Sequence, residues 1–196
     1  MNALLERLTS DHANFIRLMY CFRQQLAFLE DDQGDNDDFD VNLILDILDY
    51  INTYPNHWHH PIEDVIFDYV LQKSDQGRDV VSMLKEQHQQ IEQLTQRLES
   101  EFQKVAMDST VPVETLLGLG NQYLNLQIEH LEAEENQIFP LIDDVLEERD
   151  WQKIEESTDD IKDPLFGSSI EKVYENLLDT IISSEADGSQ IQYMGY

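Results

Sequence analysis

Hydrophobic and ring-bearing residues recur along most of the chain at alternating steps of three and four positions, the period of an amphipathic α-helix. The first stripe comprises Leu5, Leu8, His12, Phe15, Met19, Phe22 and Leu26. The second comprises Ile44, Leu48, Ile51, Pro55, His59, Ile62 and Ile66. The third comprises Val81, Leu84, His88, Ile91 and Leu98, and the fourth comprises Leu116, Gly120, Tyr123, Gln127, His130, Glu134, Ile138 and Leu141. Four long helices with polar outer faces predict an all-α, up-down-up-down four-helix bundle.

Turn-forming segments separate the four stripes. The acidic segment at 30–40 ends in Asp40, which is suited to cap the second helix. The segment SDQGRD places Gly77 near a helix end and offers Asp79 as the next cap. The segment MDSTVP ends in Pro112, which suits the first turn of the fourth helix.

The hydrophobic pattern loosens after the fourth stripe. Ser168 and Glu171 have the spacing of a capping box and predict the start of a last helix. Its stripe consists of Val173, Leu177 and Ile181. We therefore expect a bundle over residues 1–147, one or two further helices packed on it over 148–184, and a flexible tail over 185–196.

Composition narrows the class of protein. The 196 residues are 41% hydrophobic, enough for a core, and 12 Lys+Arg against 41 Asp+Glu give a formal charge of −29. This charge repels phosphate backbones and anionic headgroups, so we expect neither nucleic-acid nor membrane binding. No apolar run approaches the roughly 20 residues of a membrane helix, and the N-terminus lacks a secretory pattern. A single cysteine, Cys21, excludes an internal disulfide, and we expect a soluble cytoplasmic protein.

Four of the six histidines lie on the stripes, one on each predicted helix: His12, His59, His88 and His130. A single inward histidine is usually a hydrogen-bonded core residue, but four of them need partners if they are buried. The number of residues from each histidine to the adjoining turns agrees to within about one helical turn, or about 6 Å. The spacing therefore predicts that the four rings meet in one layer of the core.

Two glutamates share helix faces with these histidines. Glu63 follows His59 by four residues, and Glu134 follows His130 by four, so each pair points the same way. Glutamates are usually solvated surface residues, but two in phase with inward histidines are better explained as ligands. Histidine and carboxylate ligands projecting into a bundle are typical of sites for two metal ions. Imidazole and carboxylate without thiolate suit iron or manganese, with zinc as an alternative.

The order H…HxxxE…H…HxxxE resembles that of the hemerythrin-like (HHE cation-binding) family. The segments HHPIEDVIF (59–67) and HLEAEENQIFP (130–140) are similar to the metal-binding helices of that family, and DPLFG (163–167) resembles a segment that follows the bundle in bacterial members. The resemblance covers residues 1–147 firmly. It implies two iron ions joined by an oxo or hydroxo bridge, with Glu63 and Glu134 bridging and the four histidines as terminal ligands. Manganese or zinc is less expected.

The sequence departs from the family at one position. Hemerythrin itself carries HxxxH on its third helix, whereas the residues four positions from His88 are Leu84 and Glu92. A five-histidine oxygen carrier is therefore not reproduced, and fewer histidines leave more metal positions open, which favours redox sensing or reaction. His60 is either a further ligand or, as we expect, paired with Asp64.

Pro61 lies between His59 and Glu63 and predicts either a kink or the end of one helix at His60. Either outcome reorients Glu63, so the position of Glu134 is better defined. His57 and Glu92 are expected either to face solvent or to lie behind the ligands as supporting residues. Gly118 and Gly120 are expected to permit close helix contact.

The resemblance leaves the activity open. We expect first a binding protein whose reduced iron captures oxygen or nitric oxide for storage or sensing. The alternatives are an enzyme that acts on peroxide or nitric oxide, a protein of iron-centre repair, and a metal-free interaction module. The sequence identifies no protein partner.

Overall fold

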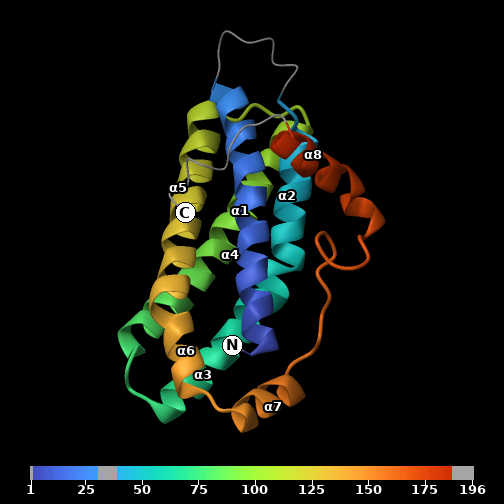
Figure 1. The fold of residues 1–196 in the computed structure, drawn as a ribbon. Coiled ribbons are helices and arrows are strands. Elements are labelled where there is room, and N and C mark those ends of the chain that lie inside the picture. Colours follow the sequence, from blue (N-terminus) through green and yellow to red (C-terminus); the bar gives the residue numbers. More distant parts are fainter. Residues whose placement is uncertain (1, 31–38, 187–196) are drawn as a thin grey trace.

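A computed structural model describes residues 2–30 and 39–186, and within them all regular structure is helical, which confirms the all-α prediction (Figure 1). Most of the predicted acidic connection (30–40) and of the predicted tail (185–196) lies outside the described residues, namely 31–38 and 187–196, and α8 extends to Ala186. The elements are α1 (Ala3–Glu30), α2 (Val41–Thr53), the π-helical turn η2 (Pro55–His59), α3 (His60–Lys73), α4 (Arg78–Ala106), α5 (Val113–Ala133), the π-helical turn η3 (Glu134–Ile138), α6 (Phe139–Val145), α7 (Glu148–Ser157), the 3₁₀ turn η4 (Lys172–Tyr174) and α8 (Glu175–Ala186).

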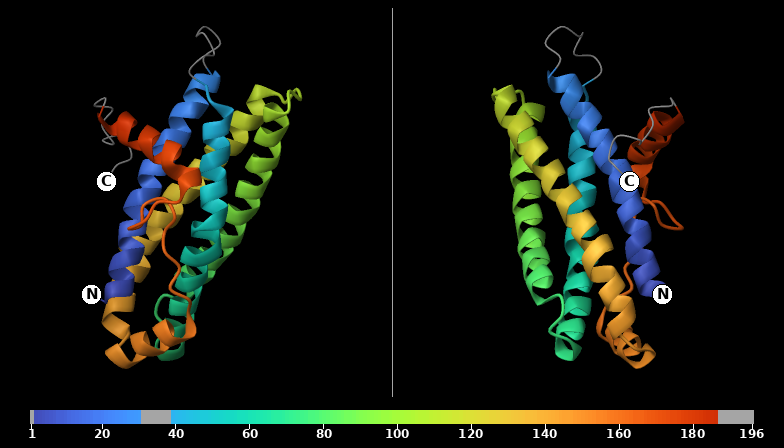
Figure 2. Two further views of the ribbon diagram at one scale, coloured as in Figure 1. Left: turned by 90° about the vertical axis from the view of Figure 1, so that its right-hand side faces the viewer. Right: turned by 60° about the vertical axis from the view of Figure 1, so that its left-hand side comes forward.

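Helix α1, α2 with α3, α4, and α5 with α6 form long rods that lie side by side, each running opposite to the next along the chain (Figures 1 and 2). Helix α1 packs against α2 and α5, and α4 packs against the same two helices. The stripes meet along the axis, where one end of the core is aromatic: Phe22 contacts Phe102 and Tyr123 edge-to-face, with ring centroids 6.5 and 6.0 Å apart. The rods thus enclose one continuous core.

Two of the predicted helices are interrupted by a π turn followed by a proline. In η2 the His60 amide donates to the Pro55 carbonyl, and Pro61 comes next. In η3 the Phe139 amide donates to the Glu134 carbonyl, and Pro140 comes next. Because proline has no amide hydrogen, a break costs the helix less here. The break at Pro61 was expected and begins about one turn earlier than predicted, whereas the break at Pro140 was not expected.

The predicted cap of the second helix is confirmed. The Asp40 carboxylate accepts hydrogen bonds from the amides of Asn42 and Leu43, at 2.8 and 3.3 Å. Pro112, which was expected inside the fourth helix, is the residue immediately before α5.

The predicted cap of the third helix is wrong. The residue that caps α4 is Gly77, whose φ of +82° a residue with a side chain rarely adopts. A Cβ atom there would lie 2.7 Å from Leu141 Cδ2, so the turn also lacks space for one. Asp79 lies in the first turn of α4, where its charge is favourable to the helix dipole.

The glycines of α5 differ from each other. A Cβ atom on Gly120 would lie 2.5 Å from Leu26 Cδ1, so this glycine permits the close contact between α1 and α5. Gly118 has open space around it. The prediction that both glycines permit close helix contact therefore holds only for Gly120.

Two further helices follow the bundle. Helix α7 packs against α3 through buried Trp151 and Ile154, and α8 lies obliquely outside α1 and α2 (Figure 2). Between them, the Asp163 carboxylate accepts a hydrogen bond from the Tyr50 hydroxyl at 3.1 Å and from the amides of Leu165 and Phe166. The intervening segment is therefore tied to the bundle.

The predicted start of the last helix is wrong. Glu171 precedes a 3₁₀ turn instead of pairing with Ser168, and α8 begins at Glu175. Val173 is 59% exposed, and Tyr174 takes its place in the buried stripe because the 3₁₀ turn shifts the register by one residue. Among residues 2–30 and 39–186, no helix has the length and apolar character needed to cross a bilayer.

Candidate metal centre

The structure brings all six sequence-predicted site residues together in the core, near the ends of the π turns. Each side chain comes from a different turn of the bundle, and none exceeds 6% exposure. They are His12 on α1, His59 at the end of η2, Glu63 on α3, His88 on α4, His130 on α5 and Glu134 at the start of η3.

The two carboxylates lie between the four rings. Glu63 is within 3.2–3.5 Å of Nε2 of His12, His59 and His88. Glu134 is within 3.3–3.5 Å of Nε2 of His12, His88 and His130. Each carboxylate thus lies close to three imidazoles, and both lie close to His12 and His88.

The inward-facing atoms of this cluster have no hydrogen-bond partner. Nine buried side-chain nitrogen and oxygen atoms lack one among the described residues, and eight of them belong to this cluster. These eight are Nε2 of His12, His59, His88 and His130 and both carboxylate oxygens of Glu63 and Glu134. Buried polar atoms are almost always satisfied, so eight orphans converging on one point indicate that a cation belongs there. The residues therefore fit a metal centre.

Each histidine is held from behind through Nδ1. The partner is Glu135 for His12 (3.2 Å), Asp11 for His59 (3.0 Å), Asp64 for His88 (2.9 Å) and Gln87 for His130 (3.2 Å). An Nδ1–H that donates outward leaves the Nε2 lone pair directed inward, which is the tautomer a metal ligand needs.

These partners form a closed ring around the bundle. Each one is the sequence neighbour of a cluster residue but supports a histidine on the next rod. Sequence reasoning did not assign these outer partners. The sequence feature that could have identified them is that each is next to a cluster residue in the chain. Asp11 precedes His12, Asp64 follows Glu63, Gln87 precedes His88, and Glu135 follows Glu134.

A second layer connects Asp11 to the C-terminal segment. The Tyr54 hydroxyl donates to Asp11 at 2.9 Å, and Arg7 donates to the Tyr54 oxygen at 3.1 Å. Arg7 also pairs with Asp160 at 2.7 Å and lies over the Trp58 ring, 3.9 Å from its centroid. The His59 side of the cluster is therefore supported by groups from both ends of the chain.

The histidines differ in their pKa values. Burial lowers the pKa of His12, but Glu134, Glu135 and Glu63 outweigh burial and hold it well above its ordinary value. The pKa of His88 is likewise lowered by burial and raised well above its ordinary value by the carboxylates around it. Burial brings the pKa of His130, whose outer partner is a neutral amide, down to about 4.

The two central carboxylates remain ionised. Burial raises the pKa of Glu63, but His59, His12 and His88 lower it to well below its ordinary value. For Glu134, burial and the nearby Glu63 raise the pKa, and the imidazoles lower it by more. The surrounding carboxylates also raise the pKa values of His12, His59 and His88, so protons on these imidazoles offset the negative charge when no cation is bound.

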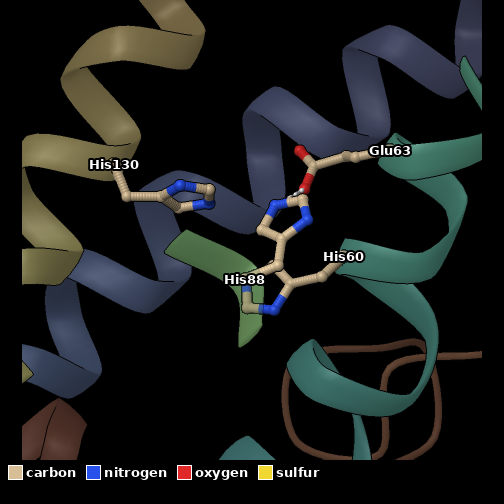
Figure 3. Close-up of side chains that lie close together, drawn as sticks. All are labelled: His60, Glu63, His88 and His130. Atoms are coloured by element: carbon tan, nitrogen blue, oxygen red, sulfur yellow. Dashed lines mark ion pairs between the residues drawn. The ribbon is translucent and has the colours of Figure 1, made fainter. Parts of the chain in front are cut away.

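His60 lies beside the cluster rather than where it was expected. Its predicted partner Asp64 binds His88 instead, so the predicted His60–Asp64 pair is wrong. The His60 ring lies parallel to that of His88, with centroids 4.5 Å apart, and burial together with His88 and His130 lowers its pKa well below the ordinary value (Figure 3). His57 and Glu92 are exposed, as expected.

A small hollow reaches the cluster from outside. It has a volume of about 120 Å³ and includes Asn56, His60, Asp64, His88 and Glu92 in its lining. On the opposite side, Phe139 stacks on His12 and Phe15 contacts His59 edge-on, with centroids 5.1 and 4.8 Å apart. Aromatic rings thus cover the His12 and His59 end of the cluster, and the hollow opens at the His60 and His88 end.

Comparison with known proteins identifies the family. The model of the hemerythrin HHE cation-binding domain matches residues 3–142, which include all six cluster residues. No curated protein and no solved structure matches the chain. Because the match covers well over half of the sequence, the chain belongs to the hemerythrin HHE cation-binding family.

Proposed function

For this member of the hemerythrin HHE cation-binding family, we propose a four-helix bundle that holds two iron ions and binds a small diatomic ligand, oxygen or nitric oxide. The observation that carries the proposal is the set of eight buried, unpartnered donor atoms that converge in the core. Such a set is costly to bury unless a cation satisfies it.

The donor atoms divide into two groups that share Glu63. One comprises His12, His59 and Glu63, and the other comprises Glu63, His88 and His130 together with His60. Glu134 faces members of both groups. In the proposed centre, Glu63 and Glu134 would be shared by the two ions, His12 and His59 would hold one of them, and His88 and His130 would hold the other.

The charge around the cluster suits iron in two oxidation states. Two bridging carboxylates lie inside, and Asp11, Asp64 and Glu135 lie behind three of the histidines. These five negative charges compare with four positive charges for a diferrous pair and six for a diferric pair. The net charge of the centre is therefore within one unit of neutral in either oxidation state. Nitrogen and oxygen donors without thiolate are also the set that suits non-haem iron.

The protein surroundings restrict what reaches the ions. Phe15 and Phe139 keep bulk water from the rings of His12 and His59. The hollow beside His60 and His88 has room for molecules of only a few atoms. When bound, iron supplies a redox-active Lewis acid, and the enclosure limits its partners to small ligands.

The test is to load the protein with ferrous iron under nitrogen, admit oxygen or nitric oxide in separate samples, and record visible spectra. We expect a new absorption band with at least one gas, and none in zinc-loaded protein or in the Glu134→Ala variant. A band that disappears when oxygen is removed identifies a carrier or oxygen sensor. Spectra that respond to neither gas, or a protein that binds no iron, would overturn the proposal. Turnover of peroxide without a stable band would show an enzyme instead.

A further inference from the structure

His60 is a buried imidazole beside the cluster. It is 6% exposed and borders the small hollow, and its nitrogens are not among the buried unpartnered atoms of the cluster. Its ring lies 4.5 Å from that of His88 and 5.5 Å from that of His130, between centroids (Figure 3). An imidazole packed against two rings of the cluster is therefore within reach of an ion that those rings hold.

The donor atoms around His60 lie near the separations of ligands on a single ion. One donor atom from each of His60, Glu63, His88 and His130 lies within 4.8 Å of the others. With metal–nitrogen bonds of about 2.1 Å, adjacent ligand atoms of a six-coordinate ion lie about 3 Å apart and opposite ones about 4.2 Å apart. A modest contraction of the observed set on metal binding reaches these values.

The ring positions agree with the same geometry. An imidazole centroid lies about 3.2 Å from the ion it binds, so two rings at right angles have centroids about 4.5 Å apart. The observed spacings are 4.5 Å for His60 and His88, 4.7 Å for His88 and His130, and a wider 5.5 Å for His60 and His130. Because the His60 ring is inclined by only 15° to that of His88, it must turn about its Cβ–Cγ bond to direct a nitrogen at a shared ion.

We propose that His60 is a fifth imidazole ligand, bound to the same ion as His88 and His130. This inference rests on the proposed di-iron function. It makes the centre unequal, with three imidazoles on one ion and two on the other. The fifth histidine then comes from the residue after His59, in place of a second histidine on α4.

The experiment compares His60→Phe, which keeps a flat ring but removes the nitrogens, with His57→Phe, a control at an exposed histidine outside the cluster. Both are loaded with ⁵⁷Fe²⁺ under nitrogen, and iron content, Mössbauer spectra and the rate of iron loss to a chelator are measured. In wild-type protein and the His57→Phe control we expect two unequal quadrupole doublets of equal area. In His60→Phe we expect one doublet to shift or disappear and one ion to be lost about 10–100 times faster.

The outcomes separate this inference from the proposed function. Wild-type protein that holds fewer than two irons refutes the di-iron proposal, and the fifth ligand with it. Wild-type protein with two irons, and a His60→Phe variant with the same doublets and the same rate of iron loss, refutes the His60 ligand alone. If His60→Phe does not fold by circular dichroism, His60→Ala replaces it, and added imidazole should restore the second doublet. Failure of imidazole to restore it then refutes the inference.

Discussion

Asp11 provides the sharpest test of how the ring of outer partners supports the metal centre. Its Oδ2 accepts hydrogen bonds from both His59 Nδ1, at 3.0 Å, and the Tyr54 hydroxyl, at 2.9 Å. In Asp11→Asn the amide oxygen can take the place of Oδ2 and accept both bonds. The substitution therefore removes the negative charge while it keeps the acceptor.

The size of the effect follows from the distance between Asp11 and the ion. With the imidazole between them, the carboxylate and the ion are about 7 Å apart, and at an effective dielectric constant of about 20 their attraction is about 5 kcal/mol. This is an upper limit, because Asp11 also stabilises a proton on His59 when the metal is absent. Losing an outer partner typically weakens metal affinity about 10–100-fold, or about 1.4–2.7 kcal/mol, which lies within that limit.

Competition with a chromophoric chelator under nitrogen measures the affinity for ferrous iron in wild-type protein and in the variant. The matched control is Tyr54→Phe, which removes one donor from Asp11 and leaves its bond to His59. We expect this control to lose about 1 kcal/mol of unfolding free energy and to keep its metal affinity within about threefold. A folded Asp11→Asn variant with wild-type affinity would refute the role given to the outer partners.

Three further predictions address protonation, packing and metal-linked stability. Metal affinity should fall as the pH falls, because His12 and His88, whose pKa values are raised in the metal-free protein, must lose their protons to bind an ion. Calorimetry in two buffers of different ionisation enthalpy should detect the released protons. A metal affinity that stays constant between about pH 5.5 and 8 would contradict this. Gly118→Ala should raise the unfolding free energy measured in urea titrations by about 0.5–1 kcal/mol, because the added methyl group meets open space. Gly120→Ala should leave the unfolding free energy unchanged or lower it, because the methyl group would collide with Leu26. Equal gains in the two variants would contradict the packing argument. Removing the metal with a chelator should lower the midpoint of thermal unfolding, since free metal at about 1,000 times its dissociation constant adds about 4 kcal/mol to the unfolding free energy. If protein shown to be metal-loaded unfolds at the same midpoint before and after chelation, the ions have no structural role.

The helices were predictable from the sequence because burial imposes its period on every long rod. Leu8, Leu48, Leu84 and Leu116 all lie on predicted stripes and all are buried. The start of α8 was not predictable in this way, because a capping box is a local signal. The course of the chain before α8 is set instead by distant contacts, such as the bond between Asp163 and Tyr50.

The six cluster residues were identifiable because each is a polar residue on an apolar stripe. His60 was harder to place, because an ideal helix directs adjacent side chains about 100° apart. The π turn η2 holds an extra residue per turn, which reduces that angle and lets His59 and His60 both face the core. The sequence signal for this turn, a proline shortly after the histidines, indicates a break but not its type.

The outer partners illustrate a different limit. Asp64 lies four residues from His60 on the same helix, so sequence spacing favoured a pair between them. The structure pairs Asp64 with His88 on α4 instead, because the cluster residue Glu63 turns inward and carries its neighbour toward the adjoining rod. Contacts between rods depend on rotation about each helix axis, which spacing along one helix does not determine.

The most direct test of the di-iron centre is a count of iron per chain. The protein is loaded with ferrous iron under nitrogen, separated from free metal by gel filtration, and analysed for iron and for protein; the Glu63→Ala/Glu134→Ala double variant is treated identically. The account predicts two irons per wild-type chain and none retained by a folded double variant. A wild-type chain with one iron or none, or a double variant that still holds two, would contradict it.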